Sequence, residues 1–346
     1  KMKQTLLLLL LVKGLLAIPH IRTEGAVDED LQTFQKFKQE FGKNYVNADE
    51  EAARFSVYRS NMQLIREHNK EFKAGKSTFW MQANKFADYT DKEYAKILGF
   101  KWQSAKKAVR GDSCTHSTVV PPEAIDWRSN GAVAAVKDQG QCGSCWTFSA
   151  TGAIEGAWFI RSGELLSLSE EEILQCDNDP DENGCDGGDM DGAFAWVVRN
   201  GGIATEEEYP YLSGASGVTG NCSTKRLRFK EAHIAGYCDV EAGDEEALEK
   251  AVAQQPVAVG IEADQKAFQF YAGGVLPAHK CGVKLDHGVL VVGFGRDDKH
   301  AMDYWVVKNS WGPDWGEEGY IRLQKFPGAG NHSACGVALA ASYAVV

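Results

Sequence analysis

The distribution of nine cysteines constrains this chain more than any other feature. Eight of them follow residue 141, and only Cys114 precedes it. Because a disulfide takes two cysteines, an odd number leaves at least one that is unpaired or bonds outside the chain. In an oxidising compartment the others are candidates for disulfides, and the remaining thiol is either a buried spare residue or a reactive group.

The first residues resemble a secretory signal peptide. Lys1 and Lys3 precede the uncharged run Leu6–Val12, and Lys13 interrupts this run before it resumes. The stretch is too short and too charged for a membrane span. We therefore expect a signal peptide over residues 1–17, with a loosely placed end, and a destination in the lysosome, the vacuole or outside the cell.

Composition and charge place the rest among globular proteins. The 346 residues are 44% hydrophobic and 25% charged, and the length allows two domains. A net charge of −11 argues against nucleic acid or an anionic membrane as the main partner. Residues 1–118 carry 20 Lys and Arg against 14 Asp and Glu, whereas residues 119–346 carry 17 against 34. The basic residues 1–118 are suited to bind the acidic residues 119–346 by electrostatic attraction. This attraction weakens when carboxylates are protonated.

Two parts follow the leader. Residues 28 to about 74 are rich in helix-forming residues and are expected to be helical. Six residues spaced by three and four share one face of this helix: Glu50, Arg54, Tyr58, Asn61, Ile65 and Asn69. A second short helical stretch and the basic linker Lys101–Arg110 follow. The tripeptide Arg110-Gly111-Asp112 matches an integrin-binding motif, but three residues match so easily by chance that we interpret it as part of the linker. Glycine, tryptophan and cysteine become frequent from Pro121 onward, so we expect the domains to be 28–118 and 119–346.

The second part predicts helices first and strands later. Cys145 to about Arg161 is expected to be a helix that ends at Ser162-Gly163. Two β-rich runs, 288–295 and 304–309, flank a polar loop and predict a hairpin. This order indicates an α+β fold with two unequal lobes.

The stretch Gln139-Gly140-Gln141-Cys142-Gly143-Ser144-Cys145-Trp146 carries the strongest chemical signal. Cys145 opens the predicted helix, and a helix N-terminus lowers the pKa of a thiol, most of all beside an imidazolium. His287 is the one histidine at the edge of a predicted strand. A hairpin centred near residue 298 would make His287 and Asn309 cross-strand neighbours, so that the amide oxygen of Asn309 fixes the imidazole.

These residues resemble the papain family of cysteine proteases, of the cathepsin L-like type, which are made as preproenzymes. The matching blocks are Gln139–Trp146, Asp286–Gly288, Asn309–Gly312 and Trp315–Glu317. The resemblance implies a papain-like fold with a helical left lobe, a β-barrel-like right lobe and a cleft between them. It implies that Cys145 is the nucleophile, His287 the general base and acid, and Asn309 the residue that orients it. Gln139 matches the side chain that completes the oxyanion hole.

The resemblance also implies substrate-binding residues and disulfides. Gly187 and Gly188 match a strip that pairs with substrate backbone, and four residues match an apolar pocket for the second residue before the scissile bond. The full substrate-binding set is Gly187, Gly188, Met190, Gly260, Leu285, Asp286, Trp311 and Ala340. Asp189, at the rim of the pocket, could admit some positive charge. The implied disulfides are Cys142 with Cys185, Cys176 with Cys222, and Cys281 with Cys335. Cys114 and Cys238 depart from the family pattern, and whether they pair with each other is open.

By resemblance, the six-residue face and the later Asn84, Phe86 and Asp88 belong to a prosegment that inhibits the enzyme until cleavage near Val119–Pro121. The implied partners are polypeptide substrates, this prosegment and cystatin-like inhibitors. We expect an endopeptidase that is a monomer and needs no metal or other cofactor.

Three other interpretations are open to the same residues. Cys142-Gly143-Ser144-Cys145 is also the Cys-x-x-Cys of thiol–disulfide oxidoreductases, which a 142–145 disulfide would support. The acidic run that begins at Asp179 copies the start of a calcium loop but has Met190 in place of its glutamate. The chain could also be an inactive, protease-like binding protein. Asn221 and Asn331 lie in glycosylation sequons whose use is open.

Overall fold

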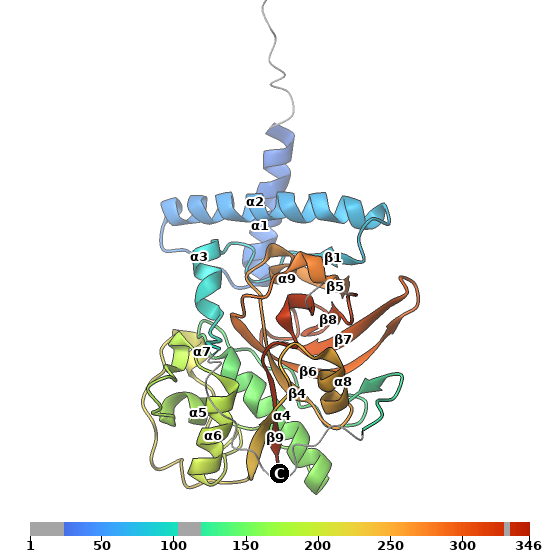
Figure 1. The fold of residues 1–346 in the computed structure, drawn as a ribbon. Helices are drawn as coiled ribbons and strands as arrows, with labels where there is room; N and C mark the ends of the chain where they lie inside the picture. Colours follow the sequence, from blue (N-terminus) through green and yellow to red (C-terminus); the bar gives the residue numbers. More distant parts are fainter. Residues whose placement is uncertain (1–23, 103–118, 329–332) are drawn as a thin grey trace, which may run out of the picture. The chain divides into compact units, whose positions relative to one another are not determined.

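Figure 1 shows a computed structural model that describes residues 24–102, 119–328 and 333–346. The expected signal peptide, most of the basic linker, Cys114 and the Asn331 sequon lie outside the described residues. The chain forms two compact units, one up to Arg59 and one from Ser60 to Val346, and the boundary falls inside helix α2.

The helices are mostly short, apart from three long ones. The α-helices are α1 (Glu24–Glu40), α2 (Ala48–Lys73), α3 (Asp91–Tyr94), α4 (Cys145–Ser162), α5 (Glu170–Cys176), α6 (Met190–Asn200), α7 (Ser213–Ser216), α8 (Glu245–Val252) and α9 (Lys266–Gln269). Single 3₁₀ turns lie at Ala95–Ile97, Gly184–Asp186, Ala278–Lys280 and Ala334–Gly336.

The first unit contains α1 and the start of α2. The expectation of helix from residue 28 to about 74 is wrong in one place, because α1 ends at Glu40 and α2 begins only at Ala48. Gly42 has a positive φ of 59°, which helical residues do not adopt, and the Asn47 side chain accepts a hydrogen bond from the Glu50 N–H at 2.9 Å and so starts the next helix. Tyr58 of α2 packs on Phe34 with ring centroids 5.2 Å apart, which forms a small aromatic core.

The six-residue face lies along α2, as the spacing predicts. In the second unit, Asn61 donates a hydrogen bond to the Ala87 carbonyl at 2.9 Å. Asn69 binds both the carbonyl and the N–H of Met81, at 2.7 and 2.9 Å. These amides position the chain that follows the helix, including the first strand.

One sheet organises the second unit. Its strands are β1 (Phe79–Met81), β2 (Ile125–Asp126), β3 (Gly236–Asp239), β4 (Val257–Ile261), β5 (Tyr271–Leu276), β6 (His287–Asp297), β7 (Met302–Lys308), β8 (Tyr320–Gln324) and β9 (Ala341–Val345). Their order is β1-β5-β8-β7-β6-β4-β9-β3, with β2 paired to β6. The α+β expectation is confirmed, but the barrel-like right lobe is a correction, because the sheet formed by the described strands is an open path whose two ends, β1 and β3, do not pair.

Helix α4 packs against β4, β6 and β9 on one side and against α5 and α6 on the other (Figure 1). It begins at Cys145 and ends at Ser162, and Gly163 follows in the left-handed conformation with φ 80°. The predicted helix and its glycine end are therefore confirmed.

The hairpin is confirmed, but its predicted register is wrong. Leu290 pairs with Lys308, which places Asn309 level with residue 289 instead of His287. Both strands extend into the predicted loop, and an irregularity between Val291 and Gly293 adds a residue to β6.

Three disulfides join the described residues: Cys142–Cys185, Cys176–Cys222 and Cys281–Cys335. They are the pairs that the family resemblance implies. Cys142 bonds Cys185 and not Cys145, and Cys145 is a free thiol, so the structure lacks the bond that the redox interpretation needs.

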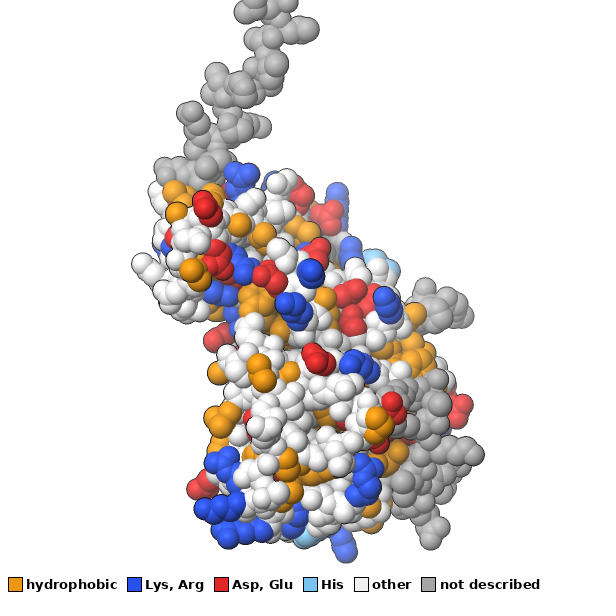
Figure 2. Space-filling model, turned by 90° about the vertical axis from the view of Figure 1, so that its left-hand side faces the viewer, with side chains coloured by type: hydrophobic (Ala, Val, Ile, Leu, Met, Phe, Trp, Pro, Cys, Tyr) orange, Lys and Arg blue, Asp and Glu red, His pale blue; other side chains and the backbone are white. Residues whose placement is uncertain are grey.

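The face shown in Figure 2 mixes charged and polar side chains with scattered hydrophobic ones. Among the described residues no helix has the length and hydropathy needed to cross a membrane.

Candidate active site

Cys145 is the first residue of α4, and its side chain is fully buried. The Gly288 N–H donates a hydrogen bond to its sulfur at 3.3 Å. One turn further along α4, the Ser149 hydroxyl donates to the Val289 carbonyl at 2.6 Å. Helix α4 is thus held against the start of β6, and the thiol lies against the residue that follows His287.

His287 and Asn309 are brought together from the two strands of the hairpin. The imidazole Nε2 lies 2.8 Å from the Asn309 Oδ1, which also accepts the Ser310 N–H at 2.8 Å. Since this amide oxygen only accepts, Nε2 is the nitrogen that carries hydrogen. The other ring nitrogen, Nδ1, is buried and has no hydrogen-bond partner among the described residues. Trp311 stacks on the ring with centroids 4.7 Å apart and shields it from water.

Gln139 connects this pair to the loop before α4. Its Oε1 accepts from the Ser310 hydroxyl at 2.7 Å and from the Trp311 indole at 3.1 Å. Its Nε2 donates to the Cys142 carbonyl and to the Ile97 carbonyl, each at 2.8 Å. The amide is fully buried, so its direction is fixed, with the donor end at the Cys142–Cys145 loop.

Residues 97–101, called the covering segment here, occupy the site. Gly188 donates to the Gly99 carbonyl and accepts from the Lys101 N–H, both at 2.9 Å, and the two chains run parallel. A Cβ on Gly187 would lie 2.4 Å from the Gly99 carbonyl oxygen, so this strip needs glycine for the backbone to approach. The residues of this segment are not among those predicted from the sequence, although the apolar run Ile-Leu-Gly-Phe before a basic linker could have indicated them.

Phe100 lies against Gly260, one of the residues of the expected specificity pocket. A Cβ on Gly260 would lie 2.3 Å from its ring. Phe100 and Met190 belong to one buried cluster, and Leu285 and Ala340 pack against it. Of the four predicted pocket residues, Gly260 thus lies next to the Phe100 ring, and Met190, Leu285 and Ala340 belong to or pack against the same large cluster. The Phe100 N–H donates to the carbonyl of Asp286 at 3.0 Å.

A cavity of about 150 Å³ lies beside the expected specificity pocket, and Met190 and Ala340 are among its lining residues. Asp189, Asp191 and Asp239 line it, together with Trp102. Burial and the two neighbouring carboxylates raise the pKa of Asp191 well above its usual value.

Burial controls the titration of the site in this covered state. It raises the pKa of the Cys145 thiol to about 11, although backbone hydrogen bonds from Gly288 and Gly99 lower it. It lowers the pKa of His287 to about 4, against the opposing effect of the Asn309 hydrogen bond. Burial also raises the pKa of Asp286 to about 7. Cys145 and His287 are both neutral at neutral pH while the covering segment is in place.

Aromatic residues before the covering segment pack over Trp311. Phe86 and Tyr94 lie edge-on to its ring, with centroids 5.1 and 5.6 Å away. Asn84 donates to the Gln269 carbonyl at 2.7 Å, and the Tyr94 hydroxyl donates to the Ala263 carbonyl at 2.9 Å. The predicted prosegment residues Asn84 and Phe86 therefore contact Gln269 and Trp311. Asp88, two residues after Phe86, is also buried.

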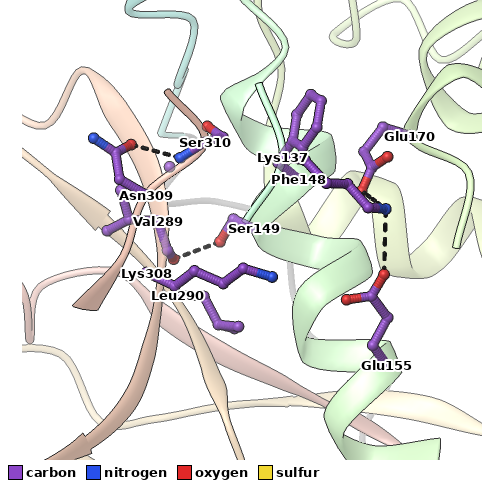
Figure 3. A pocket seen from close by; sticks show the side chains of 11 residues that line it. Lys137, Phe148, Ser149, Glu155, Glu170, Val289, Leu290, Lys308, Asn309 and Ser310 are labelled. Atoms are coloured by element: carbon purple, nitrogen blue, oxygen red, sulfur yellow. Dashed lines mark hydrogen bonds and ion pairs between the residues drawn. The ribbon is translucent and has the colours of Figure 1, made fainter. Parts of the chain in front are cut away.

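A cluster of four charged residues lies behind Asn309 around a cavity of about 20 Å³ (Figure 3). We call Lys137, Glu155, Glu170 and Lys308 the charge cluster. Lys137 lies 2.7 Å from Glu170 and 3.3 Å from Glu155, and the Lys308 amine points toward α4. Burial lowers the pKa of Lys137, but Glu170 and Glu155 raise it by more. Burial also lowers the pKa of Lys308. The charge cluster is not predicted from the sequence, because its members are far apart in the chain and match no motif.

Comparisons with known proteins indicate the same family as the sequence motifs. The family model "Papain family cysteine protease" matches residues 121–345, and the "Cathepsin propeptide inhibitor domain (I29)" matches residues 34–94. Cathepsin L of Sarcophaga peregrina is 40% identical over 324 residues, which covers 91% of this chain and 93% of that protein. Germination-specific cysteine protease 1 of Arabidopsis thaliana is 41% identical over 330 residues, covering 92% and 85%.

A solved structure extends the likeness to the fold. Digestive procathepsin L 3 from the larval midgut of Tenebrio molitor has a TM-score of 0.81 and 39% identity, and the match covers 92% of this chain and 99% of that one. The family of fold expected from the sequence is therefore confirmed. The chain is a member of the papain family of cysteine proteases, and a cathepsin-type propeptide domain precedes its peptidase domain.

Proposed function

We propose that the chain is a zymogen whose processed form cleaves polypeptides with a Cys145 thiolate and a His287 imidazolium. The carrying observation is the 2.8 Å contact between His287 and Asn309, with the free thiol of Cys145 at the start of α4 beside Gly288. Asn309 accepts a hydrogen bond from the Nε2–H, which leaves Nδ1 available for the thiol proton. Removal of the covering segment would hydrate the pair, so that the helix N-terminus can stabilise a thiolate.

The reaction follows from these roles. The Cys145 thiolate attacks the carbonyl carbon of the scissile bond, and the leaving amine takes a proton from His287. This forms a thioester between Cys145 and the acyl part of the substrate. Water then attacks the thioester as His287 accepts its proton, which releases the carboxylic acid and restores the Cys145 thiolate and the His287 imidazolium.

Gln139 and the Cys145 N–H are proposed to bind the oxyanion. The hydrogen bond from Gln139 Nε2 to the Ile97 carbonyl supports this, because a peptide carbonyl already occupies that donor in the covered state. The Ser310 and Trp311 bonds to Oε1 keep the donor oriented before the reaction begins, which is what transition-state stabilisation needs.

The prosegment is proposed to inhibit by occupying the site in the parallel, nonproductive direction beside Gly188. Two ion pairs support the acid-release hypothesis: Lys85 with Asp138 at 2.5 Å and Lys266 with Asp91 at 2.6 Å. As the pH falls, protonation of carboxylates removes such pairs and the wider attraction between a basic prosegment and an acidic domain. Cleavage near Val119–Pro121 would follow, and Val120 is 88% exposed there.

The apolar pocket around Phe100 supports a preference for Phe, Leu or Val at the second position before the scissile bond. We further propose that the enzyme is a monomeric endopeptidase of the secretory pathway, active in a lysosome, a vacuole or the extracellular space. It would need no cofactor, and cystatin-like proteins would be natural inhibitors.

Labelling with an epoxide inhibitor tests the proposal. Acid-processed protein should gain one label, located on Cys145 by peptide mass, and lose hydrolysis of a Phe-containing peptide in proportion. The Cys145→Ser variant, processed in trans, is the matched control and should remain unlabelled and inactive. Active protein that carries no label on Cys145 would contradict the assignment.

A further inference from the structure

Tyr211 lies in the loop before α7 and bonds to both stretches of backbone that border the proposed oxyanion site. Its hydroxyl donates a hydrogen bond to the backbone carbonyl of Gln139 at 2.8 Å. The same hydroxyl lies 2.7 Å from the hydroxyl of Ser144, the residue before Cys145. Because a phenol has one hydrogen and Gln139 accepts it, the Ser144 hydroxyl is the donor in the second bond. A chain of two hydrogen bonds therefore runs from Ser144 through Tyr211 to Gln139.

We propose that Tyr211 is a positioning residue for peptide hydrolysis, which keeps the Gln139 amide and the Cys145 N–H in the relative geometry that a developing oxyanion requires. Its hydroxyl bonds to the backbone carbonyl of Gln139 and to Ser144, and to neither donor N–H, so it acts through these neighbours. The inference rests on the proposed oxyanion role of Gln139. Donors of this kind work only when they are held within about 0.5 Å of the productive position.

The start of α4 shows an unusual use of its serine. Ser144 is the N-cap residue of α4, where a serine hydroxyl usually accepts a hydrogen bond from the first turn of the helix. The Ser144 side chain makes no such bond, and its fully buried hydroxyl is bonded to Tyr211 instead. The next peptide N–H belongs to Cys145 and is the second proposed donor. A bond that fixes Ser144 therefore also fixes the peptide group that carries this N–H.

The Gln139 backbone is held from both sides. Its N–H donates to the Ser310 carbonyl at 2.8 Å, and its carbonyl accepts from Tyr211. The loop of Tyr211 also packs closely here, because the Gly214 carbonyl accepts the Gln141 N–H at 2.8 Å. A Cβ on Gly214 would lie 2.8 Å from the Gln139 carbonyl oxygen. A shift of this loop would therefore move the backbone of Gln139.

Tyr211 is itself held by its backbone and by its ring. Its N–H donates to the Glu206 carboxylate at 2.7 Å, and its ring lies edge-on to Phe148 of α4 with centroids 4.9 Å apart. Burial raises the pKa of the Tyr211 hydroxyl above its usual value, so this hydroxyl stays protonated where carboxylates and imidazoles titrate. A fixed hydroxyl that remains a donor at acid and neutral pH is suited to a positioning role.

Tyr211→Phe removes only the hydroxyl and tests the inference in the processed enzyme. We expect kcat for a peptide amide to fall about tenfold with a change in KM below about twofold, because the orientation of the donors matters most in the transition state. Rates are divided by the concentration of active sites, titrated with an epoxide inhibitor at Cys145, so that misfolded protein is not counted. A kcat within about twofold of the unsubstituted enzyme would overturn the proposal.

Tyr209→Phe is the matched control. The Tyr209 hydroxyl donates to Gln175 at 2.7 Å and accepts the Ser223 N–H at 2.8 Å. It is two residues from Tyr211 and also lies in a hydrogen-bonded network, but none of these partners belongs to the proposed oxyanion site. Its loss should leave kcat within about twofold. Equal losses of kcat in Tyr209→Phe and Tyr211→Phe would indicate a general packing defect and would contradict the positioning role.

Alkylation of Cys145 by iodoacetamide separates the oxyanion site from the rest of the active site. This reaction needs the thiolate and the imidazolium but forms no oxyanion. Tyr211→Phe should therefore keep the alkylation rate of the unsubstituted processed enzyme within about twofold at each pH, although its kcat is lowered. A parallel fall of the alkylation rate and kcat would show damage to the whole site and would exclude the specific role proposed for Tyr211.

A double-mutant cycle with Gln139→Ala locates the effect. Once the Gln139 donor is removed there is less for Tyr211 to position, so Tyr211→Phe should lower kcat by less than about threefold in the Gln139→Ala background. An undiminished loss in that background would contradict a route through Gln139. The cycle also separates this inference from the proposed function. An unchanged kcat in Gln139→Ala would refute the oxyanion role itself, whereas an impaired Gln139→Ala beside a fully active Tyr211→Phe would refute only the positioning role.

Discussion

Gln139 donates a 2.8 Å hydrogen bond to the carbonyl of Ile97, so a backbone carbonyl of the prosegment occupies the donor that is proposed to hold a substrate oxyanion. The same amide is fixed from the other side by Ser310 and Trp311. In the proposed mechanism inhibition and catalysis therefore use one preorganised group, and the covering segment acts as a ligand of the site as well as a steric block.

Gln139→Ala should lower kcat by about 10² to 10³-fold with a small effect on KM, because the lost bond is strongest in the transition state. Single-turnover and steady-state hydrolysis of one peptide by the processed enzyme measure this. Gln139→Glu is the control for side-chain size, since it keeps the shape but offers an acceptor in place of a donor, and it should be impaired as well. A change confined to KM would contradict the oxyanion role.

Asn309→Ala should lower kcat/KM by about 10²-fold, because an unoriented imidazole loses part of its acid–base contribution. Asn309→Asp keeps an acceptor oxygen for His287 Nε2 and should lose less. The pH profile of kcat/KM should shift in both variants, which a purely structural defect would not cause. Equal loss in both variants with an unchanged profile would argue against an orienting role.

Gly260→Ala should move specificity toward smaller side chains, since a Cβ there would lie 2.3 Å from the Phe100 ring. We expect the ratio of kcat/KM for Phe over Val at the second position before the scissile bond to fall about tenfold or more. Two matched peptides that differ at this position measure the ratio. An unchanged ratio would show that the substrate side chain lies elsewhere.

Lys137→Met should destabilise the protein by about 3–5 kcal/mol, because it leaves the buried carboxylates of Glu155 and Glu170 without their cation. Urea unfolding of the full-length chain in a Cys145→Ala background measures this without self-digestion. Arg296→Met removes the exposed pair with Asp303 and is the control, with an expected change below about 1 kcal/mol. Similar effects for both variants would contradict the assigned burial of the charge cluster.

The sequence predicts what depends on local chemistry and misses what depends on long-range assembly. The helix Cys145–Ser162 and its end at Gly163 are predicted from local sequence signals. The contact between His287 and Asn309 is present although the predicted register is two positions off, because Asp297 pairs with Met302 and the turn is therefore centred beyond residue 298. The open sheet is not predicted from the sequence, because the family resemblance implies a barrel-like right lobe.

Two parts of the site depend on contacts between residues far apart in the sequence. The charge cluster joins Lys137, Glu155, Glu170 and Lys308 from loop, helix and strand, and only the packing of α4 on the sheet brings them together. The covering segment is short and irregular, and its role depends on pairing with Gly188, which is far away in sequence. The disulfides could be assigned by family resemblance, since counting cysteines leaves many pairings open.

The most direct test of the account is the alkylation rate of Cys145 by iodoacetamide across pH, in the full-length chain and after processing. In the full-length chain the thiol is buried and its pKa is raised to about 11, so only about one thiol in ten thousand is ionised at pH 7. We predict a rate that rises only at strongly alkaline pH in this form. Processed protein should react rapidly at neutral pH, and His287→Ala should remove that neutral reactivity. Matching pH profiles in the two forms, or an unaltered profile in His287→Ala, would contradict the thiolate–imidazolium pair and its suppression by the prosegment.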